Sequence, residues 1–387
     1  MQDNEKKPAL RFKGFTDPWE QRKLGELVEI GDIDHRMPET VADGIPYLMT
    51  GDFVGTNELN FDGTKMISEE DYCQLSQKIK PEKGDILFAR YASVGAARYV
   101  DFTRKFLISY SCAIIKKSKK INSKYLYHFI TSGKVQQQIK LEINTGSQAN
   151  IGIDSMKNHI VVSMPPLEEQ TKIADALSNL DHLITLHQRK YEKLVNIKKS
   201  MLDKMFPKNG ASAPEIRFKG FTDLWEQRKL GEMVDVCSGM DYKHLSEGDI
   251  PVYGTGGYML SVNKALSYDR NAVGIGRKGT IDKPYILKAP FWTVDTLFYA
   301  IPKDSKNIDF TFDVFQKVDW KKKDESTGVP SLSKIAINET SISTPSKLEQ
   351  ERIGSFFRNL DTLITLHQRK LEKLQNIKKS CLEKMFV

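Results

Sequence analysis

A glycine-rich segment with two adjacent cations is the part of the sequence whose residue types and spacing most clearly offer chemistry. Residues 274–279 read GIGRKG and match the GxGxxG pattern of dinucleotide-binding turns. That pattern holds a pyrophosphate only when a helix follows it. The residues that follow, TIDKPYILKAPFW, are strand-like and contain two prolines. The segment therefore favours contact of Arg277 and Lys278 with a phosphate or a nucleic-acid base over a dinucleotide site.

Motifs for catalysis, cofactors or metals are not found elsewhere in the sequence. GxxxxGK[ST] is absent, and Met164-Pro165-Pro166-Leu167 lacks the acidic or amide residue that begins the amino-methyltransferase tetrapeptide. The seven histidines and four cysteines form no HxxxH, HExxH or CxxC pattern. We therefore expect no catalytic, cofactor-binding or metal-binding residues, and no enzyme activity in this chain.

Two long segments that must position such residues are near copies of each other. Residues 181–206 and 361–386 are identical at 21 of 26 positions. In both, apolar residues recur every three or four positions, which predicts an amphipathic helix. We expect the helices to begin near Glu169 and Glu349 and to run for about 38 residues, or roughly 57 Å. The simplest way to bury both stripes is to pair the helices as a coiled coil.

A second repeat divides the chain. RFKGFTDPWEQRKLGE at 11–26 returns at 217–232 with one substitution, and we interpret it as a short docking element with a buried tryptophan. Residues 207–216 contain a Pro/Gly/Ser-rich linker. The predicted domains are a conserved block (1–26), a variable domain (27–165), a long helix (166–206), the linker (207–216), the repeated block (217–232), a second variable domain (233–345) and a second long helix (346–387).

The two variable regions have diverged almost completely, although the repeats around them have not. Each mixes strand-like runs with one helical stretch, at 122–140 and 310–318, which predicts an α+β domain. The dipeptide Thr-Gly precedes the last strand in both and suggests a shared fold. The scaffold is therefore duplicated, whereas the two variable domains perform different versions of one task.

Composition limits the class of partner. Lys and Arg total 58 against 50 Asp and Glu, so the net charge of +8 suggests an acidic partner such as nucleic acid. The scattered cysteines favour a reduced cytoplasmic compartment, and the N-terminal segment lacks the apolar region of a signal peptide. No apolar run is long enough to span a membrane, so we expect no membrane association.

Taken together, the chain resembles the specificity (S) subunits of type I restriction–modification systems over nearly its whole length. The resemblance rests on the alternation of divergent domains with repeated helices, and on phrases such as PPLEEQTKI (165–173), KGDILF (83–88) and WEQRKLGE (225–232). The second variable domain is similar to the family's YGTGG / IGRKGT / PFW-DTLF type. The departure is Ser346-Lys347, which replaces the start of the PPLEEQ form before the second helix.

The resemblance implies a non-catalytic DNA-binding subunit with a pseudo-two-fold fold. Two target-recognition domains of mixed α/β structure would be separated by two antiparallel helices, and each would read half of a bipartite site in double-stranded DNA. Two modification (methyltransferase) subunits, and restriction subunits through them, are the implied partners. S-adenosylmethionine, ATP and Mg would bind those partners. Helices of roughly 57 Å span at most about 17 base-pair steps of 3.4 Å, so helix length would set the spacer.

Base edges are read mainly by bidentate Arg, Asn and Gln and by hydroxyl side chains. On this basis the predicted DNA-binding residues lie on polar loops of both variable domains. They are Arg90, Tyr91, Ser93, Ser147, Gln148, Asn150, Tyr253, Thr255, Arg277, Lys278, Thr280, Ser331, Ser333 and Lys334.

Other interpretations remain at this point. One is a coiled-coil scaffold whose domains bind protein or glycan, although that gives no reason for an Arg-Lys turn. A solitary specificity protein with a regulatory role would share the same sequence features. The helix lysines Lys190, Lys193, Lys198 and Lys199 either face DNA or form a solvated surface.

Overall fold

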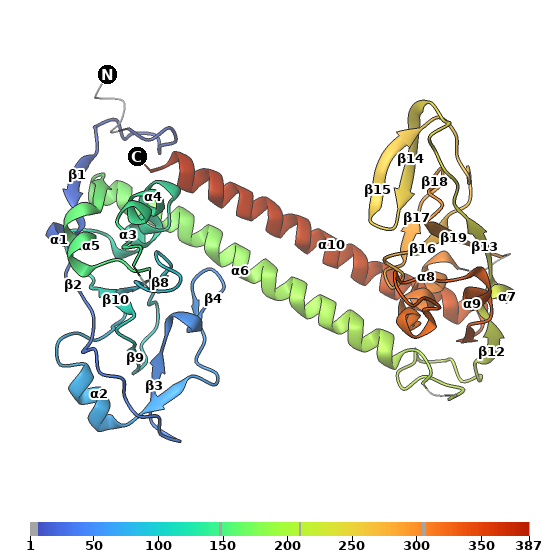
Figure 1. The fold of residues 1–387 in the computed structure, drawn as a ribbon, viewed down its shortest axis with the longest axis horizontal. Helices are drawn as coiled ribbons and strands as arrows, with labels where there is room; N and C mark the ends of the chain where they lie inside the picture. Colours follow the sequence, from blue (N-terminus) through green and yellow to red (C-terminus); the bar gives the residue numbers. More distant parts are fainter. Residues whose placement is uncertain (1–6, 147–148, 209, 304–306, 387) are drawn as a thin grey trace. The chain divides into compact units, whose positions relative to one another are not determined.

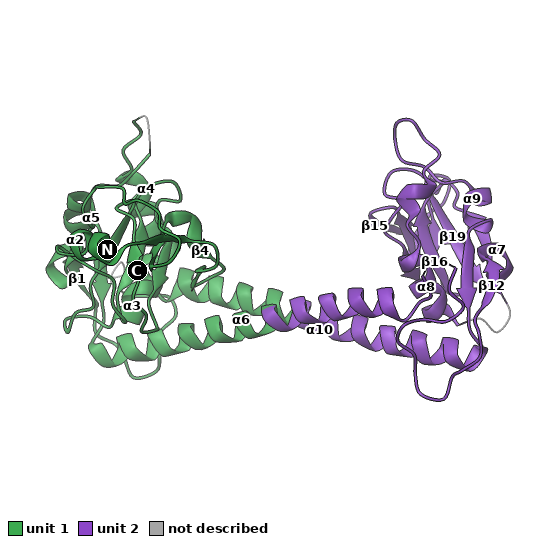
Figure 2. Cartoon of the chain, turned by 90° about the horizontal axis from the view of Figure 1, so that it is seen from below, with its two compact units in different colours: residues 1–188, 369–387 green, residues 189–368 purple. Residues whose placement is uncertain are grey.

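The computed structural model describes residues 7–146, 149–208, 210–303 and 307–386 (Figure 1). They form two compact units, which do not follow the order of the sequence. Unit 1 comprises residues 1–188 and 369–387, and unit 2 comprises residues 189–368 (Figure 2). The last part of the chain therefore folds with the first, and each long helix contributes to both units.

Unit 1 contains the first variable domain. Its elements are β1 (Glu20–Lys23), α1 (Leu24–Leu27), β2 (Ile30–Gly31), β3 (Ile45–Leu48), η2 (Thr50–Asp52), β4 (Phe53–Val54), β5 (Glu58–Leu59), β6 (Lys65–Ile67), α2 (Glu69–Leu75), β7 (Ile86–Ala89), β8 (Ala97–Tyr99), β9 (Leu107–Ile108), β10 (Cys112–Ile115), α3 (Ser123–Ile130), α4 (Gly133–Leu141), α5 (Ile153–His159), β11 (Val161–Met164) and the start of α6 (Leu167–Lys204).

Unit 2 contains the second variable domain and begins within α6. Its further elements are β12 (Glu226–Lys229), α7 (Leu230–Met233), β13 (Val234–Ser238), β14 (Glu247–Gly254), β15 (Gly257–Val262), β16 (Ala272–Gly276), β17 (Tyr285–Leu287), β18 (Trp292–Thr293), β19 (Leu297–Pro302), α8 (Ile308–Lys317), η3 (Trp320–Lys323), α9 (Lys334–Asn338), β20 (Ser341–Thr344) and the start of α10 (Lys347–Lys384).

The two variable domains share one topology despite their divergence. A four-stranded sheet has the order β2-β10-β7-β8 in unit 1 and β13-β19-β16-β17 in unit 2. A three-stranded sheet has the order β6-β3-β9 or β15-β14-β18, and in both it includes one parallel pair. The predicted α+β class and the internal repeat are confirmed.

Several local predictions need correction. The stretch 122–140, predicted as one helix, is two helices that break at Thr131 and Ser132, where Asn122 caps α3 and Ser132 precedes α4. Between the Thr-Gly dipeptide and the last strand of each variable domain lie the short helices α5 and α9, which were not predicted. These helices are only five to seven residues long, too short to establish a helical period in the sequence.

The repeated blocks dock inside the units, as the buried tryptophan predicted. Trp19 and Trp225 are 2% and 3% exposed. Each follows a segment whose arginine binds a glutamate at the start of a long helix. Arg11 donates to both carboxylate oxygens of Glu169 at 2.7 and 2.9 Å, and Arg217 does the same to Glu349 at 2.7 Å. The strand that follows each tryptophan then pairs with the strand that precedes the helix.

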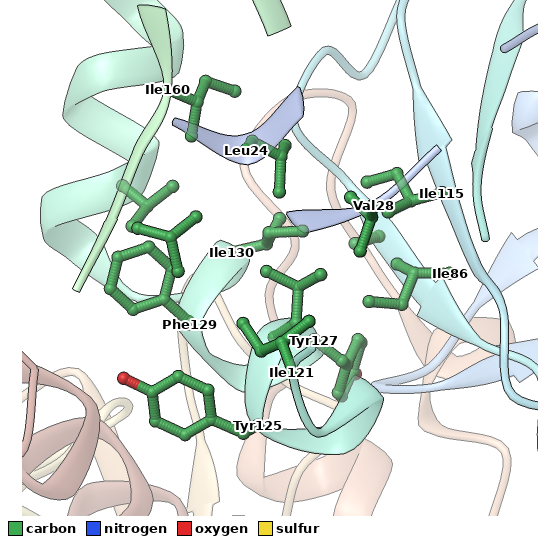
Figure 3. Close-up of a cluster of buried hydrophobic side chains, with 14 of the residues drawn as sticks. Leu24, Val28, Ile86, Ile115, Ile121, Tyr125, Tyr127, Phe129, Ile130 and Ile160 are labelled. Atoms are coloured by element: carbon green, nitrogen blue, oxygen red, sulfur yellow. The ribbon is translucent and has the colours of Figure 1, made fainter. Parts of the chain in front are cut away.

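The hydrophobic core of unit 1 lies between the four-stranded sheet and helix α3. Leu24 and Val28 from the block region meet Ile86 and Ile115 of the sheet on one side (Figure 3). Aromatic residues of α3 fill the other side. The end of α10 closes this core, because Phe386 packs edge-on against Tyr125 and Phe129 with ring centroids 5.6 Å apart.

The end of α6 plays the same part in unit 2. Phe206 contacts Trp225, Phe310 and Phe357 and is 5% exposed. Each repeated helix thus starts against its own domain and ends in the core of the other unit. The copied Met-Phe at the end of both helices is explained by this exchange.

Both long helices are 38 residues, the predicted length, although each begins two residues before the predicted glutamate. Within each unit they run antiparallel. In unit 1 Asp181 pairs with Lys378, and in unit 2 Lys198 pairs with Asp361 at 2.6 Å. The two ion pairs are equivalent, because Asp181 and Lys198 of α6 repeat as Asp361 and Lys378 of α10. Most of the predicted stripe lies on the less exposed side, but Ile377 is 40% exposed and departs from it.

Each variable domain places a buried titratable residue against these ion pairs. His128 of α3 bonds Ser178 at 3.2 Å, and Asp313 occupies the corresponding position of α8. Burial, aided by the charge of Lys378, lowers the pKa of His128 to about 3. Burial raises the pKa of Asp313 well above its usual value. Burial thus disfavours the charged form of both side chains, and with it an uncompensated charge beside each ion pair.

The exchange of helix ends predicts a unit-specific loss of stability. Phe386→Ala removes a ring that is 1% exposed, so we expect a loss of about 3 kcal/mol or more in unit 1. Amide hydrogen exchange should accelerate in α3 and stay unchanged in α8. Phe206→Ala should give the reverse pattern, and Leu366→Ala, at a position 52% exposed, should affect neither. Equal acceleration in α3 and α8 with Phe386→Ala would contradict the assignment of the helix end to unit 1.

Candidate nucleic-acid interface

The loops that carry most of the predicted residues meet at one edge of each domain. In unit 2 this edge, here called the second edge, consists of residues 277–280, 294–296 and 329–331. In unit 1 the first edge consists of residues 90–93, 109–111 and 149–150. The two edges share a backbone frame, because Arg277 N donates to Thr296 O at 2.8 Å and Arg90 N donates to Ser111 O at 2.9 Å.

A second set of hydrogen bonds makes the correspondence residue-specific. Leu332 N donates to Arg277 O at 2.9 Å, and Ile151 N donates to Arg90 O at 3.1 Å. An isolated antiparallel bridge then joins the next residues, Lys278 with Ser331 and Tyr91 with Asn150. Arg277 therefore corresponds to Arg90, and Lys278 corresponds to Tyr91.

The glycines of the second edge are required by its geometry. The segment leaves β16 and turns directly toward β17, so the helix needed for a dinucleotide site is absent from this described stretch. A Cβ on Gly276 would lie 2.1 Å from Thr280 O, and Gly279 has a φ of +87°. The tight turn leaves Arg277 and Lys278 exposed, with the Arg277 guanidinium 5.7 Å from the centre of the Phe298 ring.

An acidic residue orders the neighbouring loop. Asp324 accepts hydrogen bonds from Ser331 N at 2.9 Å and from both the amide and hydroxyl of Ser326, and these bonds lower the pKa of Asp324. Ser333 caps α9 through Ala336 N at 3.0 Å, so its hydroxyl already has a structural role. Lys334 is exposed in the first turn of α9.

The remaining two predicted residues of unit 2 lie at the end of the β14–β15 hairpin. Val294 N donates to Tyr253 O at 3.0 Å, and the hydroxyl of Tyr285 donates to Gly254 O at 2.6 Å. These bonds fix the hairpin end, including half-buried Thr255, to the turn that also contacts Arg277. Burial raises the pKa of Tyr285, so its hydroxyl stays a donor. The structure therefore brings the residues predicted in unit 2 to one edge and its adjoining hairpin and helix.

The first edge places its predicted residues differently. Ser93 is exposed, Tyr91 and Asn150 are half-buried, and Ser147 and Gln148 lie outside the described residues. Arg90 is 6% exposed and its guanidinium is used internally: Nε donates to Ile151 O at 3.0 Å, and Nη1 pairs with Asp32. The predicted base contact by Arg90 is therefore not supported. Arg90 instead binds the main chain at Ile151.

Asp32 is an acidic residue bound to the first edge that no sequence pattern indicated. Asp32 accepts from Lys78 at 3.2 Å and contacts His35 at 2.9 Å, in addition to Arg90. Burial alone would raise the pKa of Asp32, but the bonds to His35 and Lys78 and the charge of Arg90 lower it overall. His35 also stacks on Tyr110 with ring centroids 4.9 Å apart. These residues present an imidazole and an ammonium group to solvent, since the side chains of His35 and Lys78 are 61% and 67% exposed.

A signal for part of this edge was present in the sequence. GIPYLMTG at 44–51 and DIPVYGTG at 249–256 share the spacing Ile-Pro-x-x-x-Thr-Gly, which makes Thr50 the counterpart of the predicted Thr255. The structure agrees, because Ser109 N donates to Leu48 O at 2.8 Å in the same way that Val294 N donates to Tyr253 O.

The four lysines of α6 named above differ in exposure. Lys190, Lys193 and Lys199 are exposed on α6, so they remain available for a solvated face or for DNA. Lys198 was predicted to be exposed, but its side chain is 13% exposed and holds the ion pair with Asp361, above the Phe312 ring. In the described residues, no helix has the length and apolar content that a membrane span requires, and no group of acidic, His and Cys residues is suited to hold a metal.

Comparison with known proteins identifies the family of the chain. The family model described as "Type I restriction modification DNA specificity domain" matches residues 16–196 and 222–376, one match for each repeat. A putative specificity subunit of the type I restriction enzyme MjaX of Methanocaldococcus jannaschii is 24% identical over 403 residues, covering 94% of this chain and 92% of that protein. The MjaVIII specificity subunit of the same organism is 22% identical, covering 94% and 91%.

A solved structure supports the fold. The S subunit of a type I restriction–modification system from M. genitalium superposes with a TM-score of 0.74 at 18% identity, and the match covers 98% of this chain and 99% of that one. Both the sequence match and the fold extend across both repeats. The chain belongs to the type I restriction–modification specificity subunits.

Proposed function

We propose that this specificity subunit reads an interrupted DNA sequence with its first and second edges, one half-site for each. The observation that carries the proposal is the shared backbone frame that presents different side chains at equivalent places. At the second edge, exposed Arg277 and Lys278 match the donors that recognise guanine or phosphate. At the first edge Ser93 is exposed, and exposed His35 and Lys78 contact Asp32, which pairs with Arg90 of this edge.

The chain itself is proposed to be non-catalytic, with a cytoplasmic place of action. Its polar clusters are explained by structural bonds, such as Asp32 with Arg90 and Asp324 with Ser331. The chemistry of methyl transfer and of DNA translocation would come from partners that bind S-adenosylmethionine, ATP and Mg. Binding of S-adenosylmethionine by the purified chain would overturn this assignment.

The long helices are proposed to dock two modification subunits, and restriction subunits through them. Large apolar residues remain exposed at copied positions of the two helices: Leu183 and Leu186 in unit 1, and Leu363 and Leu366 in unit 2, between 37% and 52% exposed. Exposed leucines at repeated positions suit one partner bound twice in the same way. The tryptophans of the repeated blocks are buried in their own units, so they are not the contact surface.

The first experiment is methylation sequencing of DNA from a methylation-free host that expresses this chain with its modification subunit. We expect a single interrupted motif with one adenine methylated on each strand, because two edges on separate units read separate half-sites. A continuous motif would contradict the two-edge reader. The scaffold alternative, which the family match does not support, predicts no DNA affinity, whereas phosphate contacts make log affinity fall linearly with log salt.

Helix length should determine the spacer between half-sites. Inserting four residues, about one turn or roughly 5.4 Å, at equivalent positions of α6 and α10 should lengthen the unread spacer by one or two base pairs. The same sequencing experiment would measure it. An insertion of four residues in the 207–216 linker is the matched control and should leave the spacer unchanged. Identical spacers in all three proteins would exclude the helices as the determinant.

Loss of the exposed leucines should remove one partner at a time. The double variant Leu183→Glu/Leu186→Glu should bind one modification subunit in place of two, and so should Leu363→Glu/Leu366→Glu, because a charge at a dry contact is costly. Native mass spectrometry would count the subunits. Val195→Glu is the control. Val195 is 37% exposed, but it corresponds to Gln375 in the other helix, so the apolar residue is not repeated. Two bound subunits in both double variants would place docking elsewhere.

A further inference from the structure

The equivalent arginines of the two edges differ in exposure. Arg90 and Arg277 occupy equivalent positions by the hydrogen bonds and bridges described above. Arg90 is 6% exposed, and its guanidinium is bound internally by Asp32 and Ile151 O. Arg277 is exposed, and among the described residues it makes no ion pair. Something other than the backbone frame must decide where the guanidinium lies.

Strand register identifies the counterpart of Asp32. Ile30 of β2 lies opposite Ile115, which lies opposite Ile86 of β7. Val236 of β13 lies opposite Ala300, which lies opposite Val273 of β16. Ile30 therefore corresponds to Val236. The same residue offset that relates the repeated blocks holds here without a gap, and two residues further on Asp32 corresponds to Ser238.

The difference between these two residues matches the difference between the arginines. The carboxylate of Asp32 reaches Nη1 of Arg90 across the end of the sheet. Ser238 is half-buried, and it offers a shorter, uncharged side chain at the equivalent place. A charged acceptor in a poorly solvated position binds a guanidinium far more strongly than a hydroxyl does.

We propose that the residue at this position, Asp32 in the first domain and Ser238 in the second, determines whether the arginine that follows β7 or β16 reads DNA. With Asp, the arginine is withdrawn from the surface and positions the loop. With Ser, the arginine stays on the surface and contacts a base. This inference rests on the proposed function and deepens it by naming a specificity-determining position outside the exposed loops.

The first domain shows what replaces the withdrawn arginine. Asp32 also holds His35 and Lys78, whose side chains are mostly exposed. Positive charge beside the first edge therefore comes from Lys78, which precedes β7, whereas at the second edge it comes from Arg277 and Lys278, which follow β16. The same fold then offers two patterns of donors for two half-sites.

The test is Ser238→Asp in the complex with its modification subunit, read by methylation sequencing and by competition binding with DNA altered at each base pair. Arg277→Ala serves as the reference and should lose discrimination at one base pair by roughly tenfold or more. Ser238→Asp should relax the same base pair and leave the other half-site unchanged, because the new carboxylate captures Arg277. Ser238→Asn is the neutral control of similar size and should retain the wild-type motif.

A double variant separates capture from simple damage. If Ser238→Asp acts through Arg277, adding it to Arg277→Ala should change nothing further. A further loss in the double variant would overturn the proposal, and so would an unchanged motif in Ser238→Asp alone or in Arg277→Ala alone. The proposed function fails separately, since it requires an interrupted motif from the wild-type complex before any variant is compared.

Discussion

The fold of each unit depends on a buried ion pair between the repeated block and the start of a long helix. Glu169 and Glu349 are both fully buried, and removing a carboxylate from water costs several kcal/mol unless the charge is paired with good geometry. The bidentate bonds from Arg11 and Arg217 meet this requirement. They fix where each helix begins, and thereby the strand that precedes it and the tryptophan beneath it. This explains why the blocks and the helix starts are copied together while the sequence between them is not.

The variable domains are consequently free to differ at their edges. The frame of Arg90 and that of Arg277 consist of main-chain bonds, which tolerate almost any side chain. Side chains then determine charge and reach at each edge. A subunit that must recognise many sequences over evolution benefits from this division, because changes at an edge leave the core between sheet and helix intact. Asp32 and Ser238 occupy equivalent positions of the frame, and only Asp32 carries a charge there.

The sequence predicted the scaffold well and the edges only in part. The repeats, the 38-residue helices and the buried tryptophans follow from periodicity and composition, which report burial directly. Short helices such as α5 escaped because their length is set by tertiary contacts. Arg90 was misjudged because its partner, Asp32, lies 58 residues away, and no local pattern reports a pair formed by strand register. The exposed place of Arg277 on a turn could be predicted because the turn of Gly276 and Gly279 has a local signature.

The two interhelical ion pairs form a charge pattern that specifies antiparallel orientation, here called the code. Each helix carries an aspartate near its first third and a lysine near its last third, so antiparallel pairing matches opposite charges, whereas parallel pairing would match like with like. Because both helices carry the same code, however, it does not distinguish a helix of the same molecule from that of another. Selectivity for the helix within the chain must then come from the covalent tether, which raises the local concentration of the intramolecular partner. Fidelity of assembly is in this sense a property of chain connectivity rather than of complementary surfaces.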